Sequence, residues 1–314
     1  MHQPLVYILV LNYCSLYDAL DCVNSIRQIS YQNYRLLVMD NASPDGSGRI
    51  LKDNLPPEEL LQLPKNLGYA GGNNEGMRIA LENGAEYVFI VNPDIRLAPE
   101  SISAYVDVLC SDTNIGALNP IEVTKDGYTI DEQFRRGIFE GHKFPVPNLE
   151  CDSQQQWRVR TLYGAALMLP AATIRKVGGF DPLYFAYAEE EDLCRRILYH
   201  GQRLVVTAKA PVIHLRTKDA DGVSDFVLFL RLKGSYLYEL KNPTRNLKRS
   251  LRLIANYFKL DMLERRLHEY PFNRYPVRKW HVIKTAAWIL WHLQQIRMHR
   301  KMDKVGKCYL WDHY

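Results

Sequence analysis

Short apolar runs alternate with helical patterns through the first 120 residues of this 314-residue chain. Residues 5–11, 35–39 and 87–91 are rich in β-branched and aromatic side chains, which predicts three buried strands. Between them, residues 16–29 and 71–83 carry apolar side chains at helical spacing. Strand–helix–strand repeats place parallel strands side by side, with helices on both faces. We therefore expect an α/β fold with a mostly parallel sheet flanked by helices, which binds ligands at the carboxyl ends of its strands.

The rest of the chain changes character twice. Residues 125–158 are polar and include a Gln-Gln-Gln run, which predicts a long loop of the kind that often serves as a lid. Apolar patterns then return. They predict a helix that begins at Pro170, a second helix over 189–200 and a strand over 203–206. Basic, aromatic helical patterns follow residue 226. We predict a globular domain over 1–225 and a basic amphipathic helical region over 226–314.

Cysteine usage and hydropathy indicate a cytoplasmic protein. The six cysteines, at positions 14, 22, 110, 151, 194 and 308, form no Cys-x-x-Cys pair, so neither a zinc site nor a disulfide framework is predicted. The apolar run 5–11 is too short, and lacks the basic flank, to be a signal peptide. No run reaches the roughly 18 apolar residues of a membrane-spanning helix.

Charge is distributed unevenly along the chain. Residues 231–307 contain 19 Lys and Arg against 5 Asp and Glu, which gives this segment a net charge of +14. Because the whole chain has a net charge of +5, the remaining residues carry a net charge of −9. Apolar side chains form two helical stripes among these cations, one of Leu247, Leu251, Ile254 and Phe258 and one of Trp280, Ile283, Ala287, Leu290 and Leu293. Basic amphipathic helices suit an anionic membrane surface. Packing on the core and a homodimer interface are the alternatives. No nucleic-acid-binding motif accompanies the charge.

Polar side chains follow the first two predicted strands. Asn12 follows the first strand, and Asp40 opens the sequence Asp-Asn-Ala-Ser-Pro-Asp-Gly-Ser after the second. A carboxylate at a strand end can accept hydrogen bonds from a nucleobase or ribose. The same sequence is also a good turn and helix cap, so a purely structural role is the alternative.

A glycine-rich segment precedes the second helical pattern. Residues 68–76 hold four glycines, including Gly71 and Gly72, and Asn66 and Asn73 flank or interrupt them. Glycines let the backbone approach a ligand closely, and a helix N-terminus favours phosphate. A flexible loop is the alternative. The dinucleotide-binding and P-loop glycine motifs are both absent.

The third strand ends in Asn92-Pro93-Asp94. One carboxylate beside a phosphate site suits a hard divalent cation that also contacts a diphosphate. His214, after the apolar stretch 210–213, is a candidate second ligand. A turn aspartate and a structural histidine are the alternatives.

Four consecutive acids occupy positions 189 to 192, namely Glu189, Glu190, Glu191 and Asp192. Adjacent carboxylates repel each other, so at least one is expected to have a raised pKa. A fold tolerates such a cluster at a helix N-terminus or where a reaction needs a base. A solvated first helical turn is the alternative.

Taken in order, six blocks of this chain resemble family 2 glycosyltransferases of the GT-A fold, and most closely the rhamnosyltransferase-like branch that builds bacterial surface polysaccharides. The resemblance covers about residues 4–216, through the motifs VLNY, DNASPDGS, NLGYAGGNNEG, VNPD, GAALML and GGFDPLYFAYAEEEDLCRR. It implies an enzyme with a nucleotide-sugar donor and a saccharide acceptor, often lipid-linked. The Gln-x-x-Arg-Trp motif of processive synthases is absent, which implies the addition of one sugar per encounter.

The resemblance also implies roles for particular residues. Asp40 would contact the nucleoside; the remaining donor-binding residues would be Asn12, Asn66, Gly71, Gly72, Asn73 and Asn92. Asp94, the surviving carboxylate of an Asp-x-Asp motif, and His214 would hold Mn²⁺ or Mg²⁺. The base would be Glu190, a Glu where the family usually has Asp, so Glu189 stays an alternative. Asp192 would hold the acceptor or position the helix.

From this resemblance we expect inverting transfer of L-rhamnose from dTDP-L-rhamnose in O-antigen, capsule or cell-wall polysaccharide synthesis. A metal and helix amides would stabilise the leaving phosphate, while a carboxylate on the opposite face deprotonates the acceptor. UDP-galactofuranose, UDP-galactose and UDP-N-acetylglucosamine are alternative donors. Two other classes are a non-catalytic nucleotide-sugar-binding module and a sugar-1-phosphate nucleotidyltransferase; the latter needs a basic glycine-rich loop after the first strand, which is missing. We expect the enzyme to be peripheral at the inner face of the cytoplasmic membrane.

Overall fold

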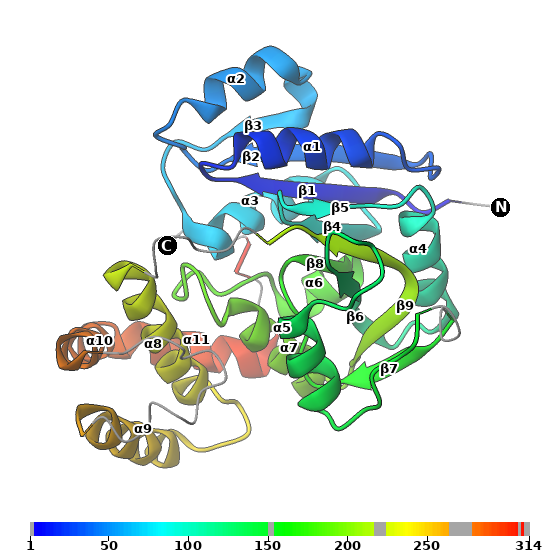
Figure 1. The fold of residues 1–314 in the computed structure, drawn as a ribbon. Coiled ribbons are helices and arrows are strands. Elements are labelled where there is room, and N and C mark those ends of the chain that lie inside the picture. Colours follow the sequence, from blue (N-terminus) through cyan, green and yellow to red (C-terminus); the bar gives the residue numbers. More distant parts are fainter. Residues whose placement is uncertain (1–2, 150–153, 217–223, 264–277, 307–308, 311–314) are drawn as a thin grey trace.

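One curled sheet with helices on both faces forms the body of the protein (Figure 1). The computed structural model describes residues 3–149, 154–216, 224–263, 278–306 and 309–310. Its strands are β1 (Val6–Asn12), β2 (Tyr34–Asp40), β3 (Leu60–Gln62), β4 (Tyr87–Val91), β5 (Ile95–Arg96), β6 (Ile115–Val123), β7 (Gln156–Val159), β8 (Ala166–Pro170) and β9 (Arg203–His214). Its helices are α1 (Leu16–Ile26), α2 (Ser47–Asn54), η1 (Pro57–Glu59), α3 (Gly68–Glu82), α4 (Ser101–Ser111), α5 (Glu132–Phe134), η2 (Arg135–Glu140), α6 (Ala171–Val177), α7 (Glu189–Tyr199), α8 (Asp225–Leu240), α9 (Leu247–Met262), α10 (Lys279–Trp291) and α11 (Leu293–Val305).

The strand order is β3-β2-β1-β4-β8-β6-β9-β5, with β7 paired to β9 at an edge. Strands β3, β2, β1 and β4 run parallel, and β6 and β9 are also parallel to each other. Strand β8 runs antiparallel to its neighbours β4 and β6. The carboxyl ends of β1, β2 and β4 therefore meet at one edge, as the sequence predicts.

Alternation along β1 divides the hydrophobic core into two layers. Ile8 and Val10 face a layer covered by α1, α2 and α4, whereas Leu9 faces a layer covered by α3, α6 and α7. Successive strand side chains point to opposite faces, so a strand buried on both sides needs a continuous apolar run. This explains the composition of residues 5–11.

Two sequence predictions need correction. The strand expected over 203–206 is the twelve-residue β9, which continues to His214 and passes through Ala210 with a φ of 48°. The stretch expected to be a loop over 125–158 contains α5, η2 and the start of β7, with Phe134, Ile138 and Phe139 buried in the core. Polar composition concealed these short elements because only a few apolar side chains anchor them. Residues 150–153 of that stretch lie outside the described residues.

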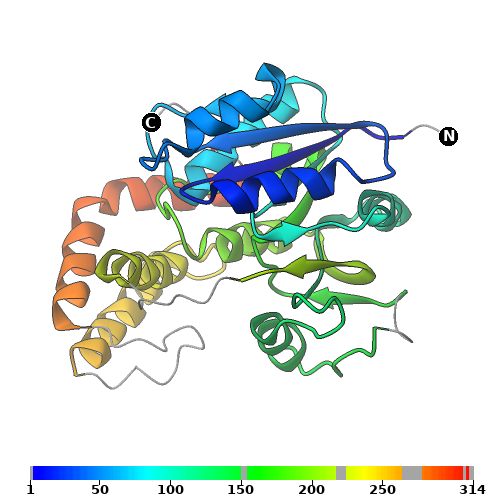
Figure 2. The ribbon, with the colours of Figure 1, turned by 45° about the horizontal axis from the view of Figure 1, so that its top comes forward.

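The C-terminal helices α8, α9, α10 and α11 gather beside the sheet (Figure 2). They share a hydrophobic cluster with Leu183 and Tyr184 of the sheet-bearing body. Most of the α9 stripe packs inward, since Ile254 is buried and Phe258 is partly buried in that cluster, whereas Leu251 is exposed. The α10 stripe differs, because Leu290 is 73% exposed and Ile283 is also exposed.

The predicted boundary at residue 226 stays a prediction. The segments 264–277 and 307–308 of the basic stretch, with Cys151 and Cys308, lie outside the described residues. Within the described ranges no helix has both the length and the apolar character needed to cross a membrane.

Candidate active site

The end of β1 is tied to the end of β2 by side-chain hydrogen bonds. Asn12 Nδ2 donates to Asp40 Oδ1 at 2.8 Å, and the hydroxyl of Ser43 donates to the same oxygen at 2.7 Å. Asn12 is fully buried and Asp40 nearly so. Asp40 Oδ2 also lies under α2, because a Cβ atom on Gly48 would come within 2.6 Å of it. The structure thus brings both predicted strand-end residues together, with Asn12 fixing the Asp40 carboxylate.

Asn41 joins the end of β2 to the segment before α3. Its Nδ2 donates to Asn66 Oδ1 at 3.1 Å and to the carbonyl of Gly68, while its Oδ1 accepts from the N–H of Leu67. Asn66 Oδ1 also accepts from the N–H of Gly68 at 2.8 Å. Asn66 therefore lies one hydrogen bond from the Asp40 strand end. Asn41 was missed as a site residue because Asp-Asn after a strand is a common turn sequence.

The glycines of α3 lie inside the helix rather than in a loop ahead of it. Gly72 faces β1, where a Cβ atom added to it would lie 2.6 Å from the Leu11 side chain. A Cβ atom added to Gly76 would lie 2.4 Å from the sulfur of Met39. These glycines let the helix pack closely on the sheet. Two first-turn amides already have partners, since Gly68 N–H donates to Asn66 and Ala70 N–H donates to the carbonyl of Phe185 at 3.0 Å. Fewer free amides therefore face an anion than a helix N-terminus usually offers.

Asn73 and Gly71 occupy different surroundings on α3. Asn73 is fully buried, donates to the carbonyl of Tyr69 at 3.0 Å and has an Oδ1 without a hydrogen-bond partner among the described residues. Gly71 is partly exposed and packs on Leu67. Direct donor contact by Gly71, Gly72 and Asn73 stays a prediction.

Asp94 and His214 lie side by side although they are 120 residues apart. His214 Nε2 lies 3.1 Å from Asp94 Oδ2, and His214 Nδ1 lies 2.7 Å from Glu122 Oε2. Pairing of β5 with β9 sets Ile95 opposite His214, which brings the two predicted ligands together. The Asp94 side chain is 24% exposed and Asn92 is partly exposed, so this end of β4 is open to a ligand.

Each group of this cluster changes the protonation of the others. Burial lowers the pKa of His214, but hydrogen bonds to Asp94 and Glu122 outweigh burial and raise the pKa to about 9. Burial raises the pKa of Asp94, but His214 outweighs it and holds that pKa below its ordinary value. Without a cation, the His214 ring therefore carries the positive charge between two carboxylates.

Glu122 and Arg216 belong to this cluster and were missed in the sequence. Glu122 is fully buried in β6, where it accepts from His214 and, at 3.1 Å, from Arg216 Nη2. Arg216 Nε also pairs with Asp131 at 2.9 Å. A single Glu inside the apolar run 115–123 was the only available signal.

The donor set fits a divalent cation shared with a diphosphate. Glu122 fixes His214 through Nδ1 and leaves Nε2 facing Asp94, which is the carboxylate–histidine arrangement found behind metal ligands. Within the described ranges, no preformed cluster of three or more His, Cys, Asp or Glu ligands occurs. Mg²⁺ and related cations commonly take only one or two protein ligands and complete their shell with water and substrate phosphates.

The acidic cluster forms the first turn of α7. Glu189 is 4% exposed, and Glu190 and Glu191 are partly exposed. Burial, and then the charge of Glu190, raises the pKa of Glu189 well above its ordinary value. Burial also raises the pKa of Glu190, and burial with the charge of Glu190 raises that of Glu191 to about 8. A fully solvated helix start does not describe this turn.

Asp192 occupies a different environment from the three glutamates. It is fully buried, and its oxygens receive hydrogen bonds from Arg195 at 2.8 Å, Arg196 at 2.9 Å and Lys241 at 3.1 Å. The Tyr184 hydroxyl donates to it at 3.2 Å. Burial raises the pKa of Asp192, but Lys241 and the arginines outweigh it and hold the pKa well below its ordinary value. Asp192 is thus engaged in holding α7 in place.

The loop before α7 is strained. Phe185, Tyr187 and Ala188 have φ values of 65°, 71° and 71°, in the left-handed region that side chains disfavour. Each such residue costs about 1–3 kcal/mol and persists only where surrounding contacts determine it. The strain lies directly ahead of Glu189 and Glu190, and backbone strain of this kind is concentrated at functional sites.

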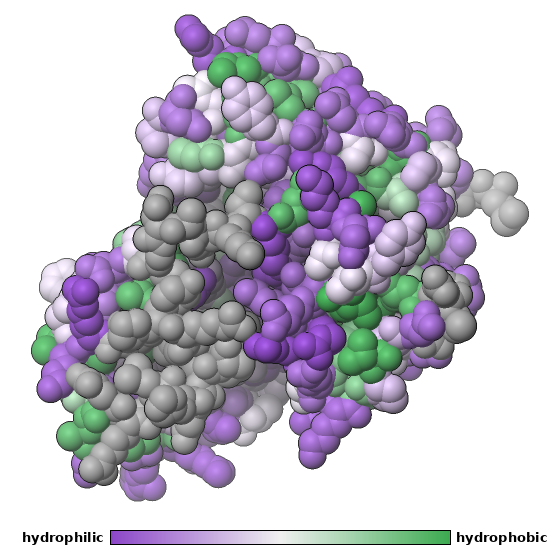
Figure 3. Space-filling view, viewed as in Figure 1, coloured by the Kyte–Doolittle hydropathy of each residue, from purple (hydrophilic) through white to green (hydrophobic). Residues whose placement is uncertain are grey.

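Two tyrosines connect the acidic turn with the Asp94 cluster. Burial raises the pKa of Tyr69, and so do the negative charges of Glu189, Glu190, Glu122 and Asp94. Burial likewise raises the pKa of Tyr163, together with Glu122, Glu191 and Glu190. The charges of both acidic groups therefore raise the pKa of the same two phenols. Polar residues gather at the centre of this face of the molecule (Figure 3).

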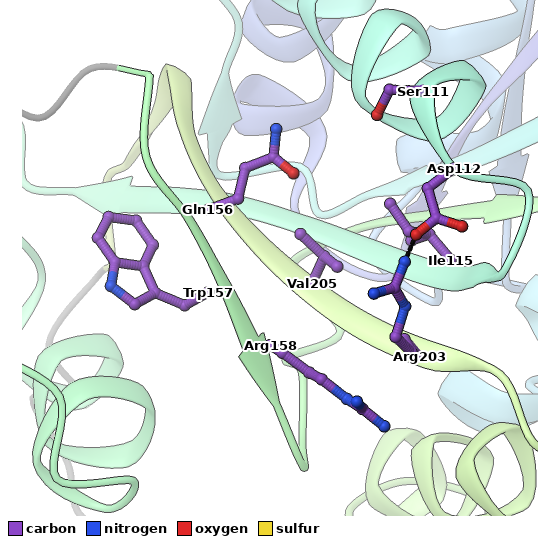
Figure 4. Close-up of a pocket in the computed structure, with 8 residues that line it drawn as sticks. All are labelled: Ser111, Asp112, Ile115, Gln156, Trp157, Arg158, Arg203 and Val205. Atoms are coloured by element: carbon purple, nitrogen blue, oxygen red, sulfur yellow. Dashed lines mark ion pairs between the residues drawn. The ribbon is translucent and has the colours of Figure 1, made fainter.

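A separate cavity lies away from these residues. It has a volume of about 290 Å³ and lies among β7, β9 and the turn after α4 (Figure 4). Trp157 and Arg158 of β7 line it, and Arg203 of β9 forms an ion pair there with Asp112. None of the candidate site residues lines this cavity.

Known proteins with similar sequences are glycosyltransferases that match about two thirds of the chain. The chain is 30% identical over 225 residues to an N-acetylglucosaminyl-diphospho-decaprenol L-rhamnosyltransferase of Mycobacterium tuberculosis. This match covers 65% of this chain and 73% of that protein. It is 23% identical to the rhamnosyltransferase WbbL of Escherichia coli K12, over 66% of this chain and 82% of that protein.

Similar solved structures include glycosyltransferases captured with nucleotide sugars. The mannosyltransferase PcManGT of Pyrobaculum calidifontis, in complex with GDP-Man and Mn²⁺, superposes with a TM-score of 0.53 at 18% identity, covering 92% of this chain and 88% of that one. TarS of S. aureus, in complex with UDP-GlcNAc, superposes with a TM-score of 0.57 at 13% identity, covering 96% of this chain and 88% of that one. These likenesses identify the fold as GT-A. The family model for glycosyl transferase family 2 matches residues 7–178, more than half of the chain. The chain therefore belongs to glycosyl transferase family 2, as a rhamnosyltransferase-like member.

Proposed function

We propose that this glycosyltransferase moves L-rhamnose from dTDP-L-rhamnose to a lipid-linked saccharide, with inversion and one sugar per encounter, during bacterial surface polysaccharide synthesis. The observation that carries the proposal is the pairing of Asp94 with His214 at the open end of β4, backed by Glu122, in a protein that also has buried acids in the first turn of α7. Rhamnosyltransferases among the relatives support the choice of sugar, and the mycobacterial one supports the choice of acceptor.

In this proposal the carboxyl ends of the parallel strands hold the donor. The Asp40 carboxylate, held by Asn12, binds the nucleoside, and Asn66 and Asn92 line the path toward the sugar. Asp94 and His214 Nε2 would hold Mn²⁺ or Mg²⁺, whose charge would offset that of the leaving diphosphate. Glu122 keeps His214 in the required tautomer through Nδ1. Arg216 places a further cation beside the same cluster.

Glu190 acts as the general base in this scheme. It is the more exposed of the first two acids of α7, and burial raises its pKa toward the range in which a base can both lose and regain a proton near neutral pH. It removes the proton of the acceptor hydroxyl as that oxygen attacks the anomeric carbon, while the bond from that carbon to the diphosphate breaks. Glu189 is buried and holds its proton more tightly, and Asp192 positions α7.

The C-terminal region supplies membrane contact in the same proposal. Residues 1–225 form the catalytic domain, and 226–314 bind peripherally to the inner face of the cytoplasmic membrane. The exposed side of α10 supports this assignment, because Trp280, Ile283, Leu290 and Trp291 lie exposed among Lys279 and Lys284. Apolar residues also show at the outer edge of the C-terminal helices in Figure 3. Such a face gives shallow, reversible binding.

A donor screen tests the proposed reaction. Thermal stability is measured with dTDP-L-rhamnose and with UDP-linked galactofuranose, galactose and N-acetylglucosamine, each with and without Mn²⁺ or Mg²⁺. A true donor raises the melting temperature by mass action, by about 2.7 kcal/mol of stabilisation at a hundred times its Kd. We expect the largest shift with dTDP-L-rhamnose and metal, and the release of dTDP when acceptor is added.

The variant Asp94→Ala is the matched control for the metal site. It should remove the benefit of added metal while the protein stays folded, because His214 alone is a poor site for a hard cation. A larger shift of the melting temperature with a UDP-sugar would make that sugar, rather than dTDP-L-rhamnose, the proposed donor. Binding without turnover on any acceptor would favour a non-catalytic nucleotide-sugar-binding module, and full activity in excess EDTA would reject the metal.

A further inference from the structure

Helix α8 lies directly against the strained loop that precedes the candidate base. A Cβ atom on Gly234 would come within 2.6 Å of the carbonyl oxygen of Tyr187. The guanidinium of Arg231 lies over the ring of Tyr187, 4.9 Å from its centroid. Residues of the C-terminal region therefore contact the loop from one side.

Helix α3 holds the same loop from the other side. The N–H of Ala70 donates to the carbonyl of Phe185 at 3.0 Å, and a Cβ atom on Gly68 would come within 2.3 Å of that oxygen. The loop is thus clamped between the glycine-rich helix of the donor side and a helix of the C-terminal extension. Contacts from both sides are what left-handed backbone at Phe185 and Tyr187 requires.

Lys233 is the one α8 residue that combines this clamp with a buried positive charge. It is 3% exposed, and its Nζ donates to the carbonyls of Leu183 at 2.9 Å and Tyr184 at 2.8 Å. The ring of Trp288 from α10 lies 4.9 Å from Nζ. Burial lowers the pKa of Lys233 to about 8, and Glu189 and Asp181 oppose that change, so the side chain is largely cationic at neutral pH.

The first two acids of α7, Glu189 and Glu190, are less well paired than Asp192. Glu189 Oε2 and Glu190 Oε2 are buried and have no hydrogen-bond partner in the part of the chain that the structure describes. Arg195 and Lys241 are occupied by Asp192. The Lys233 charge acts on Glu189, the residue next to the candidate base.

We propose that Lys233 is a positioning residue for the transfer reaction: its hydrogen bonds to two carbonyls fix loop 183–188 and so the first turn of α7. This inference rests on the proposed function, since it requires one of the acids of that turn to be the base. It makes the C-terminal extension part of the catalytic apparatus, in addition to any role at a membrane.

The test compares Lys233→Met with Lys233→Arg, using a soluble acceptor analogue. Lys233→Met should lower kcat about ten- to hundredfold, as small displacements of catalytic groups do, and leave the KM for the donor unchanged. A lower kcat at an unchanged donor KM separates a displaced base from weakened donor binding. Lys233→Arg keeps a cationic donor for the Leu183 and Tyr184 carbonyls and should recover part of kcat.

Other charged groups that face these residues are unchanged in both variants. They are Glu190, Glu191 and Tyr69 around Glu189, and Asp181 around Lys233. Lys259→Met, on the exposed side of α9, removes a cation from the same region without contacting the loop and should behave as wild type. Nucleotide binding and thermal melting report whether each variant is folded.

Wild-type kcat in Lys233→Met would overturn the inference. So would a lower kcat with no recovery in Lys233→Arg, a raised donor KM in Lys233→Met, or loss of folding in both variants, because each of these results makes Lys233 merely structural. The proposed base fails separately, if Glu189→Gln and Glu190→Gln both stay active.

Discussion

At the scale of single residues, three glutamates and one aspartate in the same helical turn have opposite environments. Glu189, Glu190 and Glu191 have raised pKa values because burial outweighs their few favourable partners. Asp192, one position later, has a lowered pKa because three cations surround it. A carboxyl group with a raised pKa can exchange protons near neutral pH, whereas one with a lowered pKa stays charged. In the proposed reaction, this turn would therefore provide a base and its support within four residues.

Glu190→Gln should nearly abolish transfer and leave donor binding intact, since loss of a general base costs about 10²–10⁴ in rate. In the wild type, kcat should fall as pH decreases, and its acid limb should lie above the ordinary glutamate pKa of 4.5, because the base must be ionised and burial raises its pKa. Steady-state kinetics from pH 5 to 9 measure both effects. Near-normal kcat in Glu190→Gln with loss of activity in Glu189→Gln would move the role one residue back.

At the scale of elements, strands and helices with clear periodicity follow from the sequence, whereas contacts between distant elements do not. The strand over 87–91 and the helix beginning at Glu189 match the predictions. The pairing of Asp94 with His214 was implied by family resemblance, but Glu122 was not, because the β6–β9 register that places it beside His214 is set by packing. The short elements within 125–158 were missed because only a few apolar side chains anchor them in a polar segment.

A buried ionic cluster joins α7, α8 and α11. Lys241, fully buried at the end of α8, pairs with Asp181, with Asp192 at 3.1 Å and with Asp303 of α11 at 3.2 Å. His299 of α11 lies 2.9 Å from Asp181. These contacts fix the C-terminal helices to the body that carries the candidate base. Sequence patterns gave no sign of them, since each member is a lone charge in its own segment.

Lys241→Met should destabilise the protein by about 3–5 kcal/mol, because removing one partner leaves buried carboxylates uncompensated. Urea unfolding followed by circular dichroism measures the change in the free energy of unfolding. The double variant Lys241→Met with Asp303→Asn removes a negative charge as well and should recover part of the loss. Lys259→Met, an exposed control, should stay within about 0.5 kcal/mol of wild type. A loss below about 1 kcal/mol in Lys241→Met would show that the cluster does not hold the helices together.

At the scale of the whole molecule, the acidic body and the basic C-terminal helices form one packed structure, in which the charges of the two parts lie in different places. The body gathers carboxylates around a candidate metal and base, whereas the extension presents cations to solvent at Lys248, Arg249 and Arg252 of α9. The α9 stripe is mostly packed on the core, as the packing alternative predicts, although Leu251 is exposed. The α10 stripe is largely exposed, as the membrane-surface alternative predicts.

The α10 face should therefore dominate membrane binding. Trp291 is 87% exposed, and Trp280 lies on the same helix beside Lys279 and Lys284. Replacing both tryptophans by Ser should reduce co-sedimentation with anionic liposomes, while activity on a soluble acceptor stays unchanged. Charge reversal at Lys248, Arg249 and Arg252 should weaken binding further and make it less dependent on salt, since each cation near an anionic surface contributes about 1 kcal/mol and salt screens it.

Tyr128→Ser is the matched control, because it removes an exposed aromatic side chain outside the C-terminal helices and should leave sedimentation unchanged. Equal sedimentation of the wild type with neutral and anionic vesicles would contradict the electrostatic contribution. If the tryptophan variant instead dissociates a dimer in sedimentation velocity and still binds vesicles normally, the α10 face is a subunit interface. Anionic lipid remains the expected partner, because two copies of this face would bring the Lys279 and Lys284 cations of each chain toward each other, and like charges at an interface oppose association.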